Sequence, residues 1–149
     1  MPDIKHIGDT DWNKDIKKAL YQMVINAAQI IRSEIKNGIE KGQDVKGNPF
    51  KRLKASTIRS KRKKGYSNPS KALWAEGKMK KLPPITRNKM KKEAVIKIAG
   101  SRIEAGFYHN EGGKHLPKRE WFGVSKKAHK NIQIALKEKL KGVLRKSFK

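Results

Sequence analysis

The chain of 149 residues contains no cysteine, which excludes disulfides, thiolate zinc sites and cysteine nucleophiles and favours an intracellular origin. Long apolar runs are also missing. No stretch approaches the roughly 20 apolar residues that a membrane-spanning helix needs, and the first residues lack the order of a signal peptide. We therefore expect a soluble chain without a membrane partner.

Acidic residues are scarce: 13 Asp and Glu face 38 Lys and Arg, which gives a formal net charge of +25. The imbalance is concentrated in residues 51–92, where 16 basic residues stand against Glu76 alone. Such a charge favours contact with polyanions or with an acidic protein surface. The apolar share of 36% suits one domain over residues 1–149, with a small core that gains stability from partners.

Apolar residues at spacings of three and four predict two long amphipathic helices, near residues 11–41 and 126–145. Gly42 follows the first helix as a left-handed terminator would, and Ser125 is a suitable N-cap for the second. Between the helices, alternating apolar residues predict a β-hairpin of strands 93–99 and 102–108.

A hairpin alone is marginally stable in water, so a third strand within residues 85–90 is expected. The predicted fold class is α+β, with a small antiparallel β-sheet flanked by the two long helices.

Residues 43–84 form a basic region that Gly, Asn and Pro make irregular, interrupted by a short helix over 55–64 capped by Ser56. Tyr66 and Trp74 are available for stacking on bases, although Trp74 beside an apolar neighbour equally suits packing. A basic run in this helix either grips phosphates or is a solvated face. The candidate polyanion contacts are Arg59, Lys61, Arg62, Lys63 and Lys64.

No arrangement of residues indicates an enzyme or a cofactor. His109, Glu111 and His115 occupy a Gly-rich loop, but helical spacing is broken there and no fourth ligand is near in sequence. Gly112-Gly113-Lys114 leads into Pro117 and not into the helix that a phosphate-binding loop requires. We expect no metal site and no catalytic site.

Two large aromatic residues, Trp121 and Phe122, follow a turn at Pro117. They either close the chain's own core or contact a neighbouring subunit. Arg119 beside them offers a planar donor fork that can pair with a neighbour's carboxylate. The candidate assembly contacts are His109, Gly112, Gly113, Pro117, Arg119, Trp121 and Phe122.

Three short motifs follow one another along the chain. Residues 47–53 read Gly-Asn-Pro-Phe-Lys-Arg-Leu, and residues 73–79 read Leu-Trp-Ala-Glu-Gly-Lys-Met. Residues 109–113 then read His-Asn-Glu-Gly-Gly, and residues 117–125 read Pro-Lys-Arg-Glu-Trp-Phe-Gly-Val-Ser. In order and spacing, this pattern resembles the phage virion morphogenesis or tail-completion family, typified by the Mu-like protein.

The resemblance implies a non-enzymatic protein of the phage neck, which completes the tail or joins head to tail as a ring around the DNA channel. It implies a homo-oligomer, with a hexamer favoured, and neighbouring portal, adaptor or tail proteins as partners. The chain is then expected in the virion, after assembly in the cytoplasm of the bacterial host. The alternative, from the charge, is a basic nucleic-acid-binding protein with non-specific DNA contact.

Overall fold

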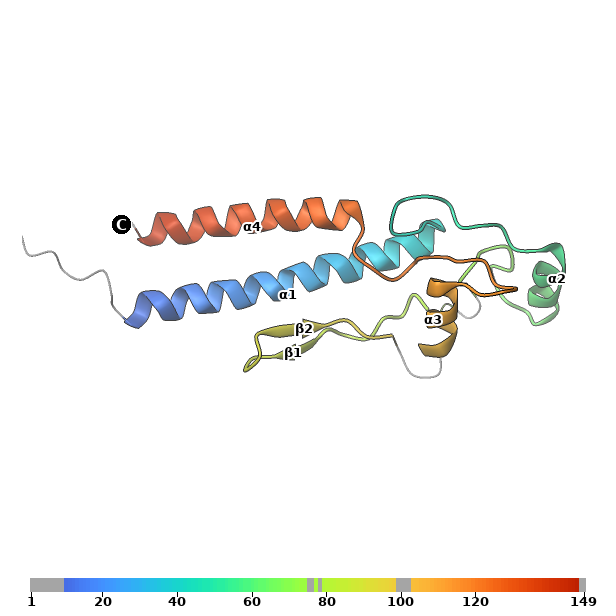
Figure 1. Ribbon diagram of the computed structural model, residues 1–149, viewed down its shortest axis with the longest axis horizontal. Coiled ribbons are helices and arrows are strands. Elements are labelled where there is room, and N and C mark those ends of the chain that lie inside the picture. Colours follow the sequence, from blue (N-terminus) through green and yellow to red (C-terminus); the bar gives the residue numbers. More distant parts are fainter. Residues whose placement is uncertain (1–9, 75–76, 78, 99–102, 148–149) are drawn as a thin grey trace, which may run out of the picture.

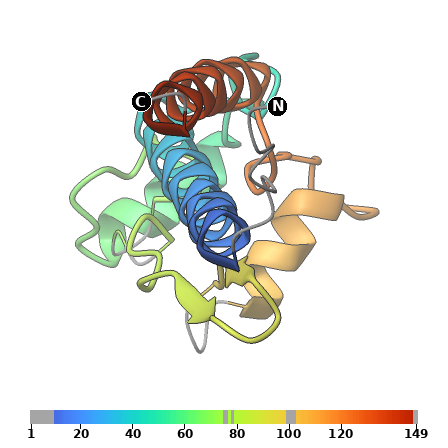
Figure 2. The same ribbon diagram turned by 90° about the vertical axis from the view of Figure 1, so that its left-hand side faces the viewer.

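Two long helices organise the computed structural model, which describes residues 10–74, 77, 79–98 and 103–147 (Figure 1). In chain order, the elements are helix α1 (Thr10–Lys41), helix α2 (Ala55–Lys63), strand β1 (Thr86–Asn88), strand β2 (Glu93–Val95), helix α3 (Ile103–Glu111) and helix α4 (Lys126–Ser147). Helix α4 lies antiparallel beside α1, and the hairpin of β1 and β2 lies on the other side of α1 (Figures 1 and 2). Helices α2 and α3 both lie towards the C-terminal end of α1, with α2 beyond it (Figure 1).

Both predicted long helices are confirmed. Gly42 has a φ of 72° directly after α1, which is the left-handed geometry of a helix terminator. Ser125 Oγ accepts a hydrogen bond of 3.0 Å from the Ala128 backbone N–H, so Ser125 caps α4 as expected. Apolar residues meet along the seam between the helices: Met23, Ala27 and Ile30 from α1, and Ile132, Ala135 and Leu136 from α4.

The sheet is a two-stranded antiparallel hairpin within the described part of the chain. Its register pairs Thr86 with Val95 and Asn88 with Glu93. The fold class is therefore α+β, with helices flanking a small antiparallel sheet, as predicted. Strand β1 falls in the segment expected to supply a third strand, and contact between β2 and α1 gives the hairpin the support that it lacks alone.

The predicted strand over 102–108 is wrong, because Ile103–Glu111 form helix α3. Alternating residues such as Ile103 and Phe107 also stand four apart, which places them on one face of a helix. Packing decides between a strand and a helix here. Gly106 is buried, and a Cβ there would lie 3.0 Å from the Trp121 ring. The expected turn at residues 100–101 lies outside the described residues.

The main core surrounds the last turns of α1. Ile35 and Ile39 of α1 pack there with residues brought from later in the chain, and Phe50, Trp74 and Phe122 cover the cluster. The later buried residues are Leu73, Met79, Leu82 and Trp121. Three later segments, around residues 50, 73–82 and 121–122, thus close on one helix end, which concentrates a limited supply of apolar residues into one core.

The basic region of residues 43–84 contains α2 as its one helix and otherwise consists, where described, of turns and irregular chain. The helix begins at Ala55 as predicted, but the Ser56 cap is wrong: Lys54 holds the N-cap position and no side chain caps α2. No residue of α2 is buried, so this helix is held by its flanking loops and not by a core face. None of the described helices is both long and apolar enough to cross a bilayer.

Candidate functional site

The candidate assembly contacts lie in the segment of residues 109–122, which turns back from the end of α3. Gly112 has a φ of 78°, and a Cβ there would lie 2.9 Å from the Lys118 backbone nitrogen. Gly113 and Leu116 exchange two backbone hydrogen bonds, of 2.8 and 3.1 Å, and so close a tight turn. Gly112 is thus required both for its left-handed backbone and for the close approach of the returning chain.

Hydrogen bonds tie the returning chain to α3. The Arg119 N–H donates to the His109 carbonyl at 2.7 Å, and the Phe122 N–H donates to Asn110 Oδ1 at 3.1 Å. Trp121 Nε1 donates to the Gly106 carbonyl at 3.0 Å. Helix α3 and the 109–122 segment therefore form one connected unit.

Trp121 belongs to the core of the chain itself. Its side chain is only 2% exposed and packs in the cluster that contains Ile35 and Ile39. Phe122 is half-buried against the same cluster, edge-on to Trp121 with ring centroids 5.3 Å apart. Of the two interpretations left open by the sequence, core packing describes Trp121.

Arg119 is 3% exposed and lies inside the fold. Its Nη2 donates to the Lys51 carbonyl at 3.2 Å, and its Nη1 lies 3.5 Å from His109 Nδ1. Nε is buried without a hydrogen-bond partner among the residues that the structure describes. Burial lowers the pKa of Arg119. The guanidinium fork is thus engaged within the chain and is not presented to a neighbour.

Buried Arg119 and the partly buried His109 and Lys61 form a basic cluster. Burial, followed by repulsion from Arg119 and then from Lys61, lowers the pKa of His109. Burial and repulsion from Arg119 also lower the pKa of Lys61, whose ammonium donates to the Lys71 carbonyl at 2.7 Å. The carbonyls of Lys71 and Lys51 accept hydrogen bonds from Lys61 and Arg119, so these charged side chains hold loops together.

The candidate polyanion contacts divide into two groups. Lys61 is partly buried and belongs to this basic cluster, whereas the remaining four residues are exposed on or just after α2. These four are Arg59, Arg62, Lys63 and Lys64. Trp74 packs against the core, and the ammonium groups of Lys71 and Lys80 lie 5.1 and 5.6 Å from its ring centroid. The packing interpretation thus describes Trp74.

One exposed apolar surface was missed by the sequence reasoning. Ile103, Phe107 and Tyr108 are all exposed on α3, and the two aromatic rings lie edge to face with centroids 6.0 Å apart. Val124, just beyond the 109–122 segment, is exposed as well. The incorrect strand prediction hid this α3 surface, since a strand would have placed Phe107 and Tyr108 on opposite faces.

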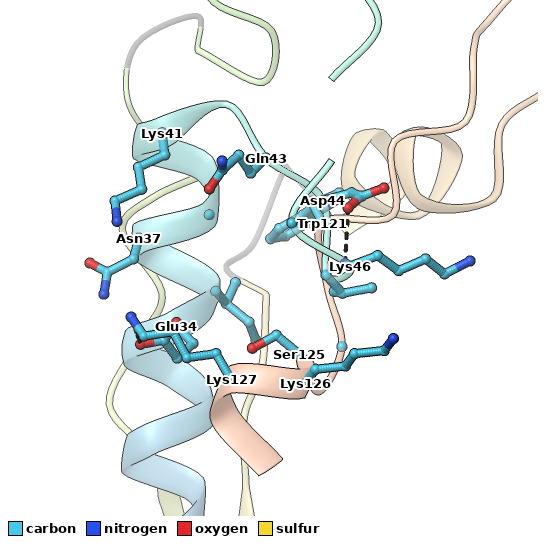
Figure 3. A pocket seen from close by; sticks show the side chains of 15 residues that line it. Glu34, Asn37, Lys41, Gln43, Asp44, Lys46, Trp121, Ser125, Lys126 and Lys127 are labelled. Carbon is cyan, nitrogen blue, oxygen red and sulfur yellow. Dashed lines mark hydrogen bonds and ion pairs between the residues drawn. The ribbon is translucent and has the colours of Figure 1, made fainter. Parts of the chain in front are cut away.

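A cleft of about 240 Å³ separates the end of α1 from the start of α4 (Figure 3). Trp121 forms part of its wall, and Lys127 makes a 3.1 Å ion pair with Glu34 beside it. Asp44 accepts hydrogen bonds from the backbone of residues 46 and 48, and Ser125 is committed to capping α4. The polar groups that line this cleft therefore stabilise the junction of three segments.

No group of three His, Asp or Glu side chains in the described ranges is placed to share a metal ion. No family model matches the chain, and no curated protein or solved structure is detectably similar to it.

Proposed function

We propose that this chain is a non-enzymatic structural protein of a bacteriophage virion, which completes the tail or joins head to tail at the neck. It assembles as a homo-oligomeric ring around the DNA channel, with a hexamer as the favoured size. Its neighbours are portal, adaptor or tail proteins, and the ring is built in the bacterial cytoplasm.

The observation that carries this proposal is the convergence of the three motifs. Phe50 comes from the first motif, Leu73 and Met79 from the second, and Trp121 from the last. All four belong to, or pack against, the core cluster that contains Ile39. Each of the three motifs thus supplies a residue to the main core, as framework positions of a shared fold would. Their convergence supports reading them as the framework of a shared fold, and with it the resemblance on which the neck assignment depends.

The exposed surface of α3 supports assembly. Phe107 is 59% exposed, and Ile103 and Tyr108 beside it are similarly uncovered. Aromatic residues exposed next to one another are typical of the central part of a protein–protein interface. Because Arg119 and Trp121 are buried, the proposed subunit contact lies on α3 and on the exposed turn that follows it.

The test combines sedimentation velocity over a range of concentrations with localisation of the protein in particles of the parent phage. We expect a closed oligomer and density at the neck. Phe107→Ser should weaken the oligomer and reduce incorporation without unfolding the monomer. Met90→Ser is the matched control, since Met90 is 95% exposed at the hairpin turn, away from α3. A monomer at every concentration, together with absence from the neck, would refute the proposal.

The alternative function, a basic nucleic-acid-binding protein, is favoured by the four exposed cations of α2 and its C-terminal end. Formation of a specific complex with virion proteins separates the two functions. A dedicated nucleic-acid binder should bind isolated duplex with an affinity that falls steeply with salt and should form no specific complex with virion proteins. A neck protein should form that complex.

A further inference from the structure

A second basic surface lies away from α2, in a groove between the N-terminal half of α1 and the β-hairpin. We call it the α1–hairpin groove. It has a volume of about 800 Å³. Its lining residues are Lys14, Lys17, Lys18, Tyr21, Gln22 and Ile25 from α1, with Arg87, Lys89 and Lys92 from the hairpin.

Six of these nine residues are cations, and no carboxylate is among them. All six cations are exposed. Lys14, Lys17 and Lys18 stand at the spacing that places side chains on one helix face, while Arg87 and Lys89 approach from the opposite wall. Like charges that face each other across a groove repel. Binding of a ligand of dense negative charge would reduce this repulsion.

Tyr21 supplies an independent indication of a ligand. Its Oη is buried and has no hydrogen-bond partner among the described residues. A buried hydroxyl left unpaired is unfavourable, and proteins rarely retain one without a partner. Because Tyr21 lines the groove, a ligand that shifts the side chains covering its hydroxyl group would supply the missing acceptor.

Lys92 gives a third indication. It has a φ of 55°, a left-handed conformation that glycine or asparagine adopts far more readily than lysine. This turn position places the Lys92 ammonium 5.3 Å from the centroid of the Tyr21 ring. Backbone strain of this kind is common where a side chain is held for binding.

We propose that the α1–hairpin groove binds the phosphate backbone of duplex DNA without reading its sequence. Cations on both walls match a rod of evenly spaced negative charge. The Lys92 ammonium over the Tyr21 ring hinders stacking of a base there, which favours backbone contact over recognition of unpaired bases. A second copy of the chain is a poor occupant of this groove, because its 13 Asp and Glu against 38 Lys and Arg offer little dense negative charge.

This site is separate from the α3 surface proposed for subunit contact and does not depend on it. A ring that encloses DNA would use both surfaces, the α3 surface for contact between subunits and the α1–hairpin groove for contact with the DNA. DNA binding and neck assembly can be measured separately, and either can fail while the other holds.

The first experiment compares two triple variants of the full chain that lose the same charge. The groove variant is Lys17→Gln, Arg87→Gln and Lys92→Gln. The control variant is Arg59→Gln, Arg62→Gln and Lys63→Gln, on α2. Fluorescence anisotropy follows binding to a mixed-sequence duplex of about 20 base pairs between about 50 and 200 mM salt.

Each lost phosphate contact reduces the magnitude of the slope of log affinity against log salt by about 0.9. The slope of the groove variant should therefore be smaller in magnitude by about 2.7, and its DNA affinity should be at least tenfold weaker. The control variant should keep most of the slope. Equal losses in both variants would overturn the proposal in favour of diffuse attraction. Circular dichroism checks folding, and Lys92→Gly is a second variant that removes one cation while relieving the turn.

The second experiment uses Tyr21→Phe, which removes only the unpaired hydroxyl group. The melting temperature should stay the same or rise, because a buried unpaired group is lost, while affinity for DNA falls several-fold. A stable variant with unchanged DNA affinity would overturn the assignment of this hydroxyl to the ligand.

An acidic protein segment is the rival occupant, and poly-glutamate of matched charge is its probe. Under the proposal, poly-glutamate competes weakly and is little affected by Tyr21→Phe. If poly-glutamate binds more tightly than DNA and loses affinity in the groove variant, the site belongs to an acidic protein partner. Sedimentation of the groove variant should still show the wild-type oligomer, which separates this test from that of the neck assignment.

Discussion

Replacing Trp121 with alanine distinguishes a core residue from an interface anchor. The indole is 2% exposed, packs in the cluster with Ile35 and Ile39, and donates its N–H to the Gly106 carbonyl at 3.0 Å. Trp121→Ala removes the ring from the point where α1, α3 and the 109–122 segment meet. If this packing holds the fold together, the isolated monomer should be strongly destabilised.

The magnitude follows from burial. Truncating a buried tryptophan to alanine costs about 3 to 5 kcal/mol, through lost transfer free energy and the cavity that remains. Loss of the hydrogen bond to Gly106 adds about 1 kcal/mol. A domain of this size has a total free energy of unfolding of about 5 to 15 kcal/mol, so the variant should lose a large part of it.

Urea unfolding followed by the helical circular dichroism signal measures this loss without relying on tryptophan fluorescence. Trp121→Phe should fall between the wild type and Trp121→Ala, since it keeps a ring but loses the donor. Met90→Ala is the control: its side chain is 95% exposed and lies outside the proposed interface, and we expect a change within about 0.5 kcal/mol. A Trp121→Ala protein as stable as the wild type would refute the reasoning and restore the interface interpretation.

Three further predictions concern the same region. Gly112→Ala should destabilise the fold by about 1 to 3 kcal/mol in urea unfolding, because its φ is 78° and Lys118 leaves no room for a methyl group; an unchanged midpoint would show that the turn can rearrange. The pKa of His109 is lowered in the folded state by burial and by Arg119, so stability should be full above the unfolded value of about 6.5 and fall as the pH drops below it towards the lowered pKa. Urea midpoints between about pH 8 and 5 should show this fall, and His109→Gln should abolish it. Ser125→Ala should cost about 1 kcal/mol in thermal or urea unfolding by removing the cap of α4, and a change near zero would mean that water replaces the hydroxyl group.

The candidate sites were only partly predictable. The sequence located the 109–122 segment and its glycine turn, because glycine and proline act through the local backbone. It did not predict that Arg119 is buried, since that depends on the carbonyl of Lys51, far away in the chain. Lys17 and Arg87 also stand about half the chain apart in sequence, whereas the fold brings them to one groove.

By itself, the sequence determined the two long helices and their boundaries near Gly42 and Ser125. Helical periodicity sustained over many turns outweighs competing local preferences, and a cap or a left-handed glycine acts within a few residues. The tertiary structure decided the state of residues 103–111, because a short alternating segment suits either a strand or a helix. There the close contact of Gly106 with Trp121 selects the helix, and that contact exists only once the chain has folded back on itself.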